Sequence, residues 1–211
     1  MNHLEYYSDC VLPDNWVIFR KKIYPLTLGH LVVLSRLRSI LILGEKYDGT
    51  IDIPKIISDI LLFILVCSTD KFNVARQFIF SDKLSYWHNR FIKKYTKYLL
   101  KNPEAALSYR EEIIKYIEYN LATPSVFRNS RIQKAEDDMV INSAYFSCNR
   151  VAGMKLGYSS EEIWDIPLKQ LNYELLTNSE LEGLVNFISD DPQMQQIIDS
   201  QKAFMKTLNK Q

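Results

Sequence analysis

Glycine and proline are scarce in this 211-residue sequence, which has six glycines and seven prolines. Few residues are therefore available for tight β-hairpin turns, and the one Asp-Gly pair, at 48–49, follows only a short strand candidate at 40–43. Prolines tend instead to stand at expected helix starts, where the missing N–H costs nothing. This composition favours a mainly helical fold.

Cysteine is also rare. Cys10, Cys67 and Cys148 are odd in number, far apart and in no CxxC arrangement, so the sequence suggests neither a disulfide framework nor a cysteine zinc site. Cys67 follows a run of seven apolar residues and is expected to be a small buried hydrophobe. A reducing cytoplasm fits this usage.

Long apolar runs are absent. The most apolar run, 60–67, lies between Asp59 and Asp70 and is far shorter than the roughly 20 residues of a membrane helix. The N-terminal MNHLEYYSDC lacks the layout of a signal peptide. We therefore expect a core helix at 60–67, no membrane association and a cytoplasmic location.

A strong net charge is missing too, since the formal value is +1, and nucleic acid is therefore not the expected partner. Residues 81–134 nevertheless carry eleven basic and five acidic side chains, whereas 135–211 carry six and twelve. The resulting +6 and −6 suit partner binding or a homo-oligomer, but the pattern is more typical of two solvated helical faces.

Apolar spacing predicts an all-α fold, an irregular multi-helix bundle with a short extended segment near the N-terminus at 16–19. We expect an N-terminal helical region at 1–122, a linker at 123–133 and an acidic helical region at 134–211, or else one continuous domain. Helices are predicted over 26–38, 53–67, 71–79, 82–101, 103–121, 138–156 and 167–188, with a last one after 192. Ser81 is the expected cap of the helix at 82–101, Gly157 the expected C-cap of the one at 138–156, and SSEE at 159–162 the expected capping box of a single helical turn that follows.

Three of these helices have stripes that we expect to face the core. In the helix expected at 82–101, the lysines at 93, 94, 97 and 101 lie on the face opposite its apolar stripe. The expected core positions are Leu28, Val32, Leu34 and Leu37; Leu84, Trp87, Phe91, Tyr95 and Leu99; and Leu107, Ile114, Ile117 and Leu121.

Catalytic signatures are not found. The three histidines lie in separate segments, and no metal-binding spacing, phosphate loop or nucleophile elbow occurs, so we expect no catalytic residue, no metal and no cofactor. Glu111 and Glu112 are adjacent on a helix and point about 100° apart, which does not suit an acid/base pair. The sequence therefore favours a protein that is not an enzyme.

Gly29 and His30 stand early in the helix expected at 26–38. Positive charge is disfavoured there, so His30 is expected to be neutral and hydrogen-bonded rather than a ligand. Gly29 costs a helix roughly 1 kcal/mol relative to alanine, which suggests that another backbone approaches closely. We expect that neighbour to be the helix at 53–67, with a partner protein as the alternative.

The segment 165–187 offers a broad apolar face, while Glu174, Glu180 and Glu182 make the rest of its surface acidic. Such a face either fills the core or receives a helix from another protein. Its leucines, with the two residues above, are the predicted partner-binding positions: Leu168, Leu171, Leu175, Leu176, Leu184, Gly29 and His30.

Three blocks of sequence carry a resemblance. IYPLTLGHLVVLSRL at 23–37, SDILLFILVCS at 58–68 and GYSSEEIWDIPLKQLNYELLTNSELEGLV at 157–185 together resemble small helical proteins encoded among phage tail genes, which are similar to tail assembly chaperones of long-tailed bacteriophages. The resemblance covers about a quarter of the chain. It consists mostly of leucine patterns, which Gly29, His30, Gly157 and Pro167 interrupt.

That resemblance implies a non-enzymatic assembly protein in the cytoplasm of an infected bacterium. It would bind apolar helices of the tape measure protein until the tail tube encloses them, and would need no nucleotide. Two alternatives stay open. One is a structural virion component, such as a head-tail connector or packaged protein, and the other is a nucleic-acid-binding or regulatory protein.

Overall fold

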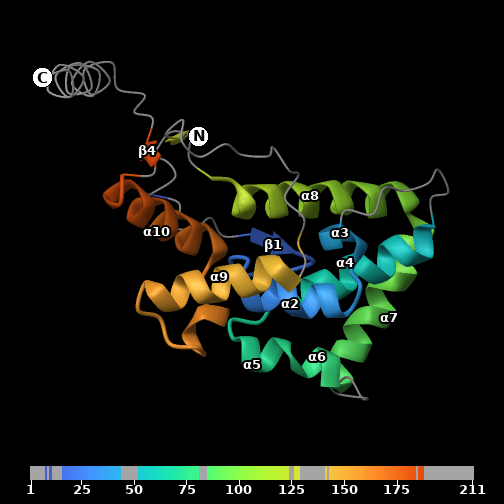
Figure 1. Cartoon of the computed structure of the whole chain (residues 1–211). Helices are drawn as coiled ribbons and strands as arrows, with labels where there is room; N and C mark the ends of the chain where they lie inside the picture. Colours follow the sequence, from blue (N-terminus) through green and yellow to red (C-terminus); the bar gives the residue numbers. More distant parts are fainter. Residues whose placement is uncertain are drawn as a thin grey trace, which may run out of the picture.

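The computed structural model confirms the mainly helical fold, with a short two-stranded hairpin near the N-terminus (Figure 1). It describes residues 8, 10, 16–43, 52–80, 85–123, 126–128, 141, 143–183 and 185–187. Its elements are β1 (Trp16–Ile18), β2 (Lys21–Ile23), α2 (Leu28–Arg36), α3 (Ile40–Leu43), α4 (Ile53–Cys67), α5 (Phe72–Ala75), α6 (Gln77–Phe80), α7 (Tyr86–Lys101), α8 (Pro103–Leu121), β3 (Val126–Arg128), α9 (Ser143–Lys155), the 3₁₀ helix η1 (Glu162–Trp164), α10 (Leu168–Leu181) and β4 (Val185–Phe187).

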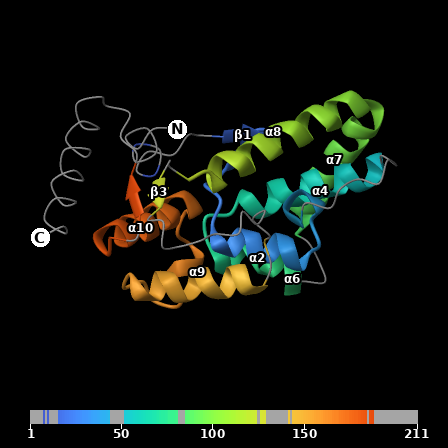
Figure 2. The same ribbon diagram turned by 45° about the horizontal axis from the view of Figure 1, so that its top comes forward.

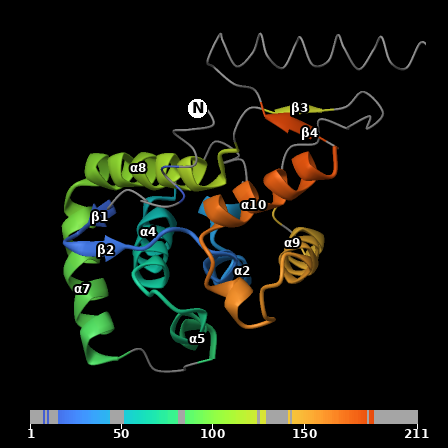
Figure 3. The same cartoon turned by 90° about the vertical axis from the view of Figure 1, so that its left-hand side faces the viewer.

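Helix α4 is the centre of the core. It packs against α2, α7 and α8 (Figures 2 and 3), and every residue from Ile56 to Cys67 except Ser58 and Leu62 is buried. Asp52 caps its start by accepting the N–H of Lys55, and Cys67 is fully buried, as expected. No helix in the described part of the chain is long and apolar enough to cross a membrane.

The hairpin β1–β2 extends the segment predicted at 16–19, but its second strand was not predicted. Strands β1 and β2 pair antiparallel, with Trp16 opposite Ile23. Phe19 and Arg20 in the turn have φ of 50° and 61°, as the two central residues of a type I′ turn do, although glycine or asparagine usually fills those positions. The Phe19 ring stacks on Tyr95 with centroids 4.2 Å apart, and this packing offsets the turn's unfavourable backbone.

Buried polar side chains serve backbone groups that lack partners elsewhere. Asn120 accepts the N–H of Leu26 at 3.0 Å and donates to the carbonyl of Tyr116 at 2.8 Å. Asp59 accepts the N–H of Ile40 at 2.8 Å. Because an unsatisfied buried N–H costs about 1–3 kcal/mol, these bonds fix the chain before α2 and the start of α3.

A seam joins the C-terminal helices to the N-terminal ones. Thr27 and Pro167 form an antiparallel β-bridge, and the N–H of Leu168 donates to the carbonyl of Leu26 at 2.7 Å. The Phe72 and Trp164 rings stack beside this bridge, 5.3 Å apart. Leu168 is part of the same apolar core as α4 and α8.

Two predicted stripes are confirmed in part. In α7, Phe91, Tyr95 and Leu99 pack against the core as predicted, whereas Trp87 is 71% exposed. His88 rather than Trp87 faces α6, with its ring 5.2 Å from that of Phe78. In α8, Ile117 is buried as predicted, and the other buried side chains lie one position before those predicted. Its buried residues are Ala106, Ile113, Tyr116, Ile117 and Asn120.

Helix boundaries were predicted with mixed success. Helix α7 is capped by Ser85 rather than Ser81, and 40–43 is a helical turn, not a strand. Helix α10 ends at Leu181, short of the predicted 188, because Gly183 has a φ of 72° and its N–H bonds Glu180. Strand β4 follows and pairs with β3.

The predicted end of α9 at Gly157 and the capping box that follows it are confirmed. Gly157 has a φ of 97°, and Ser159 and Glu162 form a reciprocal capping box. Of the expected linker at 123–133, the structure describes Thr123 and the strand 126–128. The helix expected after 192 lies outside the described residues.

Candidate functional site

An apolar groove of about 530 Å³ runs between α4 and α7 and ends at α6. Eight of its ten described lining residues are apolar. The other two, Ser58 and Thr96, carry hydroxyl groups, so none of the ten is charged. The lining residues are Pro54, Ile57, Ser58, Leu61, Leu62, Leu65, Phe78, Ile92, Thr96 and Leu100.

The groove exists because α4 is apolar on nearly all sides. Phe63 faces α8, with its ring 5.9 Å from that of Tyr116. Leu61 lies about 200° around the helix from Phe63 and therefore points the other way. Ile57, Leu61 and Leu65 form the buried floor, with at most 2% of their surface exposed. Leu100 of α7, 51% exposed, borders the open side.

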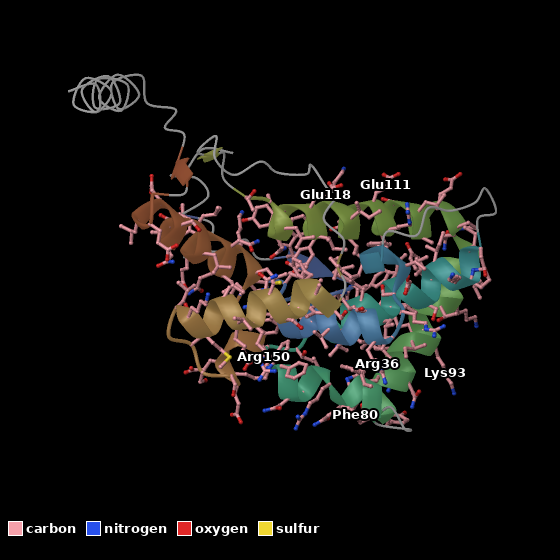
Figure 4. All side chains as sticks on the ribbon, in the orientation of Figure 1. Arg36, Phe80, Lys93, Glu111, Glu118 and Arg150 are labelled. Carbon is pink, nitrogen blue, oxygen red and sulfur yellow. The ribbon has the colours of Figure 1, made fainter. Side chains whose placement is uncertain are left out.

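Lysines follow the α7 edge of this groove. A second depression of about 550 Å³ shares Ile92 and Leu100 with it and is also lined by Lys93, Lys97 and Lys101, all three of them exposed. Figure 4 shows Lys93 pointing away from the body of the molecule. The site is therefore an uncharged floor beside a positively charged edge.

Exposed aromatic side chains continue the apolar surface past the α6 end of the groove. Phe80 is 78% exposed, Tyr86 70% and Trp87 71%, and the Tyr86 and Trp87 rings pack edge to face at 5.6 Å. Arg90 lies over the Trp87 ring at 6.0 Å. A cation-π contact of this kind keeps the indole at the surface.

The groove was not among the sequence-predicted sites. Its α7 side consists of Ile92, Thr96 and Leu100, which recur every four residues between the expected core stripe and the lysines. That spacing is the one signal in the sequence for an apolar surface beyond the core stripe, and it is a weak one. Its α4 side looks like ordinary core.

The structure places the predicted leucines apart from this groove. Leu168 and Leu171 are buried with 0% of their surface exposed, and Leu175 and Leu176 are half-buried on α10. Leu184 lies outside the described residues. The end of this face is exposed instead at Leu181, to 83%.

Gly29 and His30 are buried as well. A Cβ at Gly29 would lie 2.7 Å from the carbonyl oxygen of Trp164 and 2.8 Å from Cδ2 of Phe72. The expected close approach is thus confirmed, but the expected neighbour was wrong. Elements η1 and α5 approach Gly29, rather than α4, because the seam brings 164–168 across the start of α2.

His30 is a structural histidine, as predicted. Its Nε2–H donates to the carbonyl of Thr69 at 2.9 Å, and its Nδ1 accepts the N–H of Thr27 at 3.3 Å. Burial lowers the pKa of His30 from 6.5 to about 4, although the Thr69 hydrogen bond and the Asp165 charge oppose the shift. Its ring is 1% exposed and ties α2 to the end of α4.

None of the described residues that line the groove is titratable. Among the described residues, no three His, Cys, Asp or Glu side chains lie close enough together to hold a metal ion. A polar cluster lies at α10, where Tyr158 donates to Glu174 at 2.5 Å and Gln170 donates to the same carboxylate at 2.9 Å. Burial, followed by the bond to Glu174, raises the pKa of Tyr158 to about 12, so its hydroxyl stays a donor that joins the loop to α10.

Comparisons with protein-family models, with curated proteins and with solved structures find no match to this chain.

Proposed function

We propose that this chain is a non-enzymatic binding protein that shields an apolar helix of another polypeptide. This is the activity expected of a tail assembly chaperone, and the tape measure protein of a long-tailed phage is the proposed client. The observation that supports the proposal is the uncharged groove between α4 and α7, open to solvent along Leu62 and Leu100. Apolar grooves between helices are a common binding site for an amphipathic helix of another protein.

The shape of the groove suits a helix better than an extended strand. Both of its long walls are helices, whose backbone N–H and C=O groups are already paired within α4 and α7, so there is no free edge for strand addition. From Pro54 to Leu65 the α4 wall extends about 16 Å at 1.5 Å per residue, which matches three turns of a bound helix. The proposed ligand is therefore an amphipathic segment with apolar residues three and four apart.

A peptide-binding experiment tests this proposal. The probe is a synthetic 18-residue helix with leucines at positions i, i+3, i+4 and i+7, uncharged elsewhere, and labelled for fluorescence anisotropy. Saturable binding to the full chain is expected. Because Leu100 contributes an exposed apolar wall, Leu100→Gln should weaken binding about tenfold, the loss of about 1.4 kcal/mol of apolar contact.

Leu181→Gln is the control, since Leu181 is also an exposed leucine, at 83% against 51% for Leu100, but lies on a different helix. It should leave the dissociation constant unchanged, and both variants should keep the Tm of the parent. Absence of saturable binding, or equal loss in both variants, would contradict the proposal. Co-expression with a tape measure fragment then tests the client, which should become more soluble and elute together with this chain.

A further inference from the structure

Resting on the proposed function, we infer that the groove selects one class of client helix, namely an apolar stripe flanked on one side by carboxylates. The observation that carries this is the asymmetry of the two walls. The α7 edge carries Lys93, Lys97 and Lys101, while the floor between the walls carries no charge. A client helix would therefore meet apolar surface below and positive charge on one flank.

The lysine spacing fits a helix in particular. Residues four apart on α7 stand about 6 Å apart along its axis, and carboxylates four apart on a client helix repeat at the same distance. Helices packed side by side cross at about 20° in bundles, so three successive pairs stay within reach over two turns. A client with glutamates at i, i+4 and i+8 beside its leucine stripe meets all three lysines.

Among the described residues, no carboxylate lines this edge. The two carboxylates of α4 and its cap are engaged elsewhere. Asp59 accepts the N–H of Ile40, is 8% exposed and lies near Lys55 of the same helix. Asp52 caps the start of α4. The charged side chains that line the described edge are thus the lysines of α7.

The experiment compares three peptides with one leucine stripe and different flanks, which carry glutamates, lysines or glutamines. At low salt the glutamate peptide should bind about tenfold more tightly than the glutamine peptide, because three exposed ion pairs each add a small gain in affinity. The lysine peptide should bind most weakly. Raising the salt to 1 M should bring the three dissociation constants together.

Variants then assign the effect to the α7 edge. The triple variant Lys93→Gln, Lys97→Gln and Lys101→Gln should abolish the preference, so that the glutamate, glutamine and lysine peptides bind with equal affinity at low salt. A control of equal charge removes three exposed lysines elsewhere, namely Lys22→Gln, Lys115→Gln and Lys155→Gln. This control should keep the preference, which separates a local effect from one of net charge.

The outcomes separate the two proposals. If none of the three peptides binds, the proposed function fails. If all three bind with equal affinity at low salt, or if the control triple loses the preference, only the charge selection is overturned. If the chain self-associates on a sizing column and the Lys93, Lys97 and Lys101 triple variant does not, a second copy occupies the groove, and the inference of a client helix is overturned.

Discussion

Replacing Gly29 with alanine should lower the free energy of unfolding by about 2–3 kcal/mol, the upper part of the range for overpacked cores. The new Cβ would lie 2.7 Å from the carbonyl oxygen of Trp164 and 3.0 Å from Cβ of Phe72. Neither atom is the end of a flexible side chain, so α2 and η1 must separate. For a chain of this length the Tm should fall by about 4–12 °C, which scanning calorimetry measures.

Gly153→Ala is the comparison. There the added Cβ would lie 2.1 Å from Cδ1 of Ile163, a side chain that a second substitution can shorten. Ile163→Ala, which removes a fully buried side chain, should therefore cost less stability in the Gly153→Ala background than in the parent, whereas no side-chain truncation removes the Trp164 carbonyl from Gly29. A Gly29→Ala protein as stable as the parent would show that the seam between α2 and η1 is not closely packed.

Lowering the pH from 6.5 to 4 should remove about 3 kcal/mol of stability through His30 alone, at about 1.36 kcal/mol per unit of pKa shift. The pKa of His30 is lowered to about 4 in the folded chain, from 6.5. Between these values the unfolded chain binds a proton that the folded chain does not, so stability falls as the pH falls. Above pH 6.5 and below pH 4 this group adds no further slope.

Urea unfolding at a series of pH values measures this slope, and His30→Gln isolates it, because glutamine does not titrate. Between pH 4 and 6.5 the variant should take up about one proton fewer on unfolding than the parent, so its free energy of unfolding should depend less steeply on pH, whatever its absolute stability. His88→Gln should lose much less, because His88 is only partly buried and its pKa is lowered less. A His30→Gln slope equal to that of the parent would contradict the assignment.

The positions of several helices could be predicted from local signals in the sequence. Helix α4 begins and ends where its apolar run and Pro54 predict, and the Ser159–Glu162 capping box follows from two residues three apart. The neutral state of His30 could likewise be predicted, because its position early in a helix disfavours charge. Residues close together in the sequence determine these features, so each could be predicted from its own segment.

Features set by tertiary packing could not be predicted in the same way. The β1–β2 turn has no glycine, and the aromatic rings around Phe19 that support it come from α7 and α8. The buried side of α8 keeps the predicted Ile117 but otherwise lies one residue before the predicted positions, because its neighbours decide which side faces inward. The groove was missed for the same reason, since α4 and α7 form it only when packed together.

Occupation of the α4–α7 groove by a helix is tested most directly by site-specific photo-crosslinking. A photoreactive amino acid at Thr96, in the wall of the groove, should form a covalent adduct with the glutamate-flanked leucine peptide, and excess unlabelled peptide should suppress it. The same group at Glu118, an exposed position on α8 (Figure 4), should give none. Equal adducts at both positions, or none at Thr96 under conditions where the peptide binds, would show that the client helix lies elsewhere.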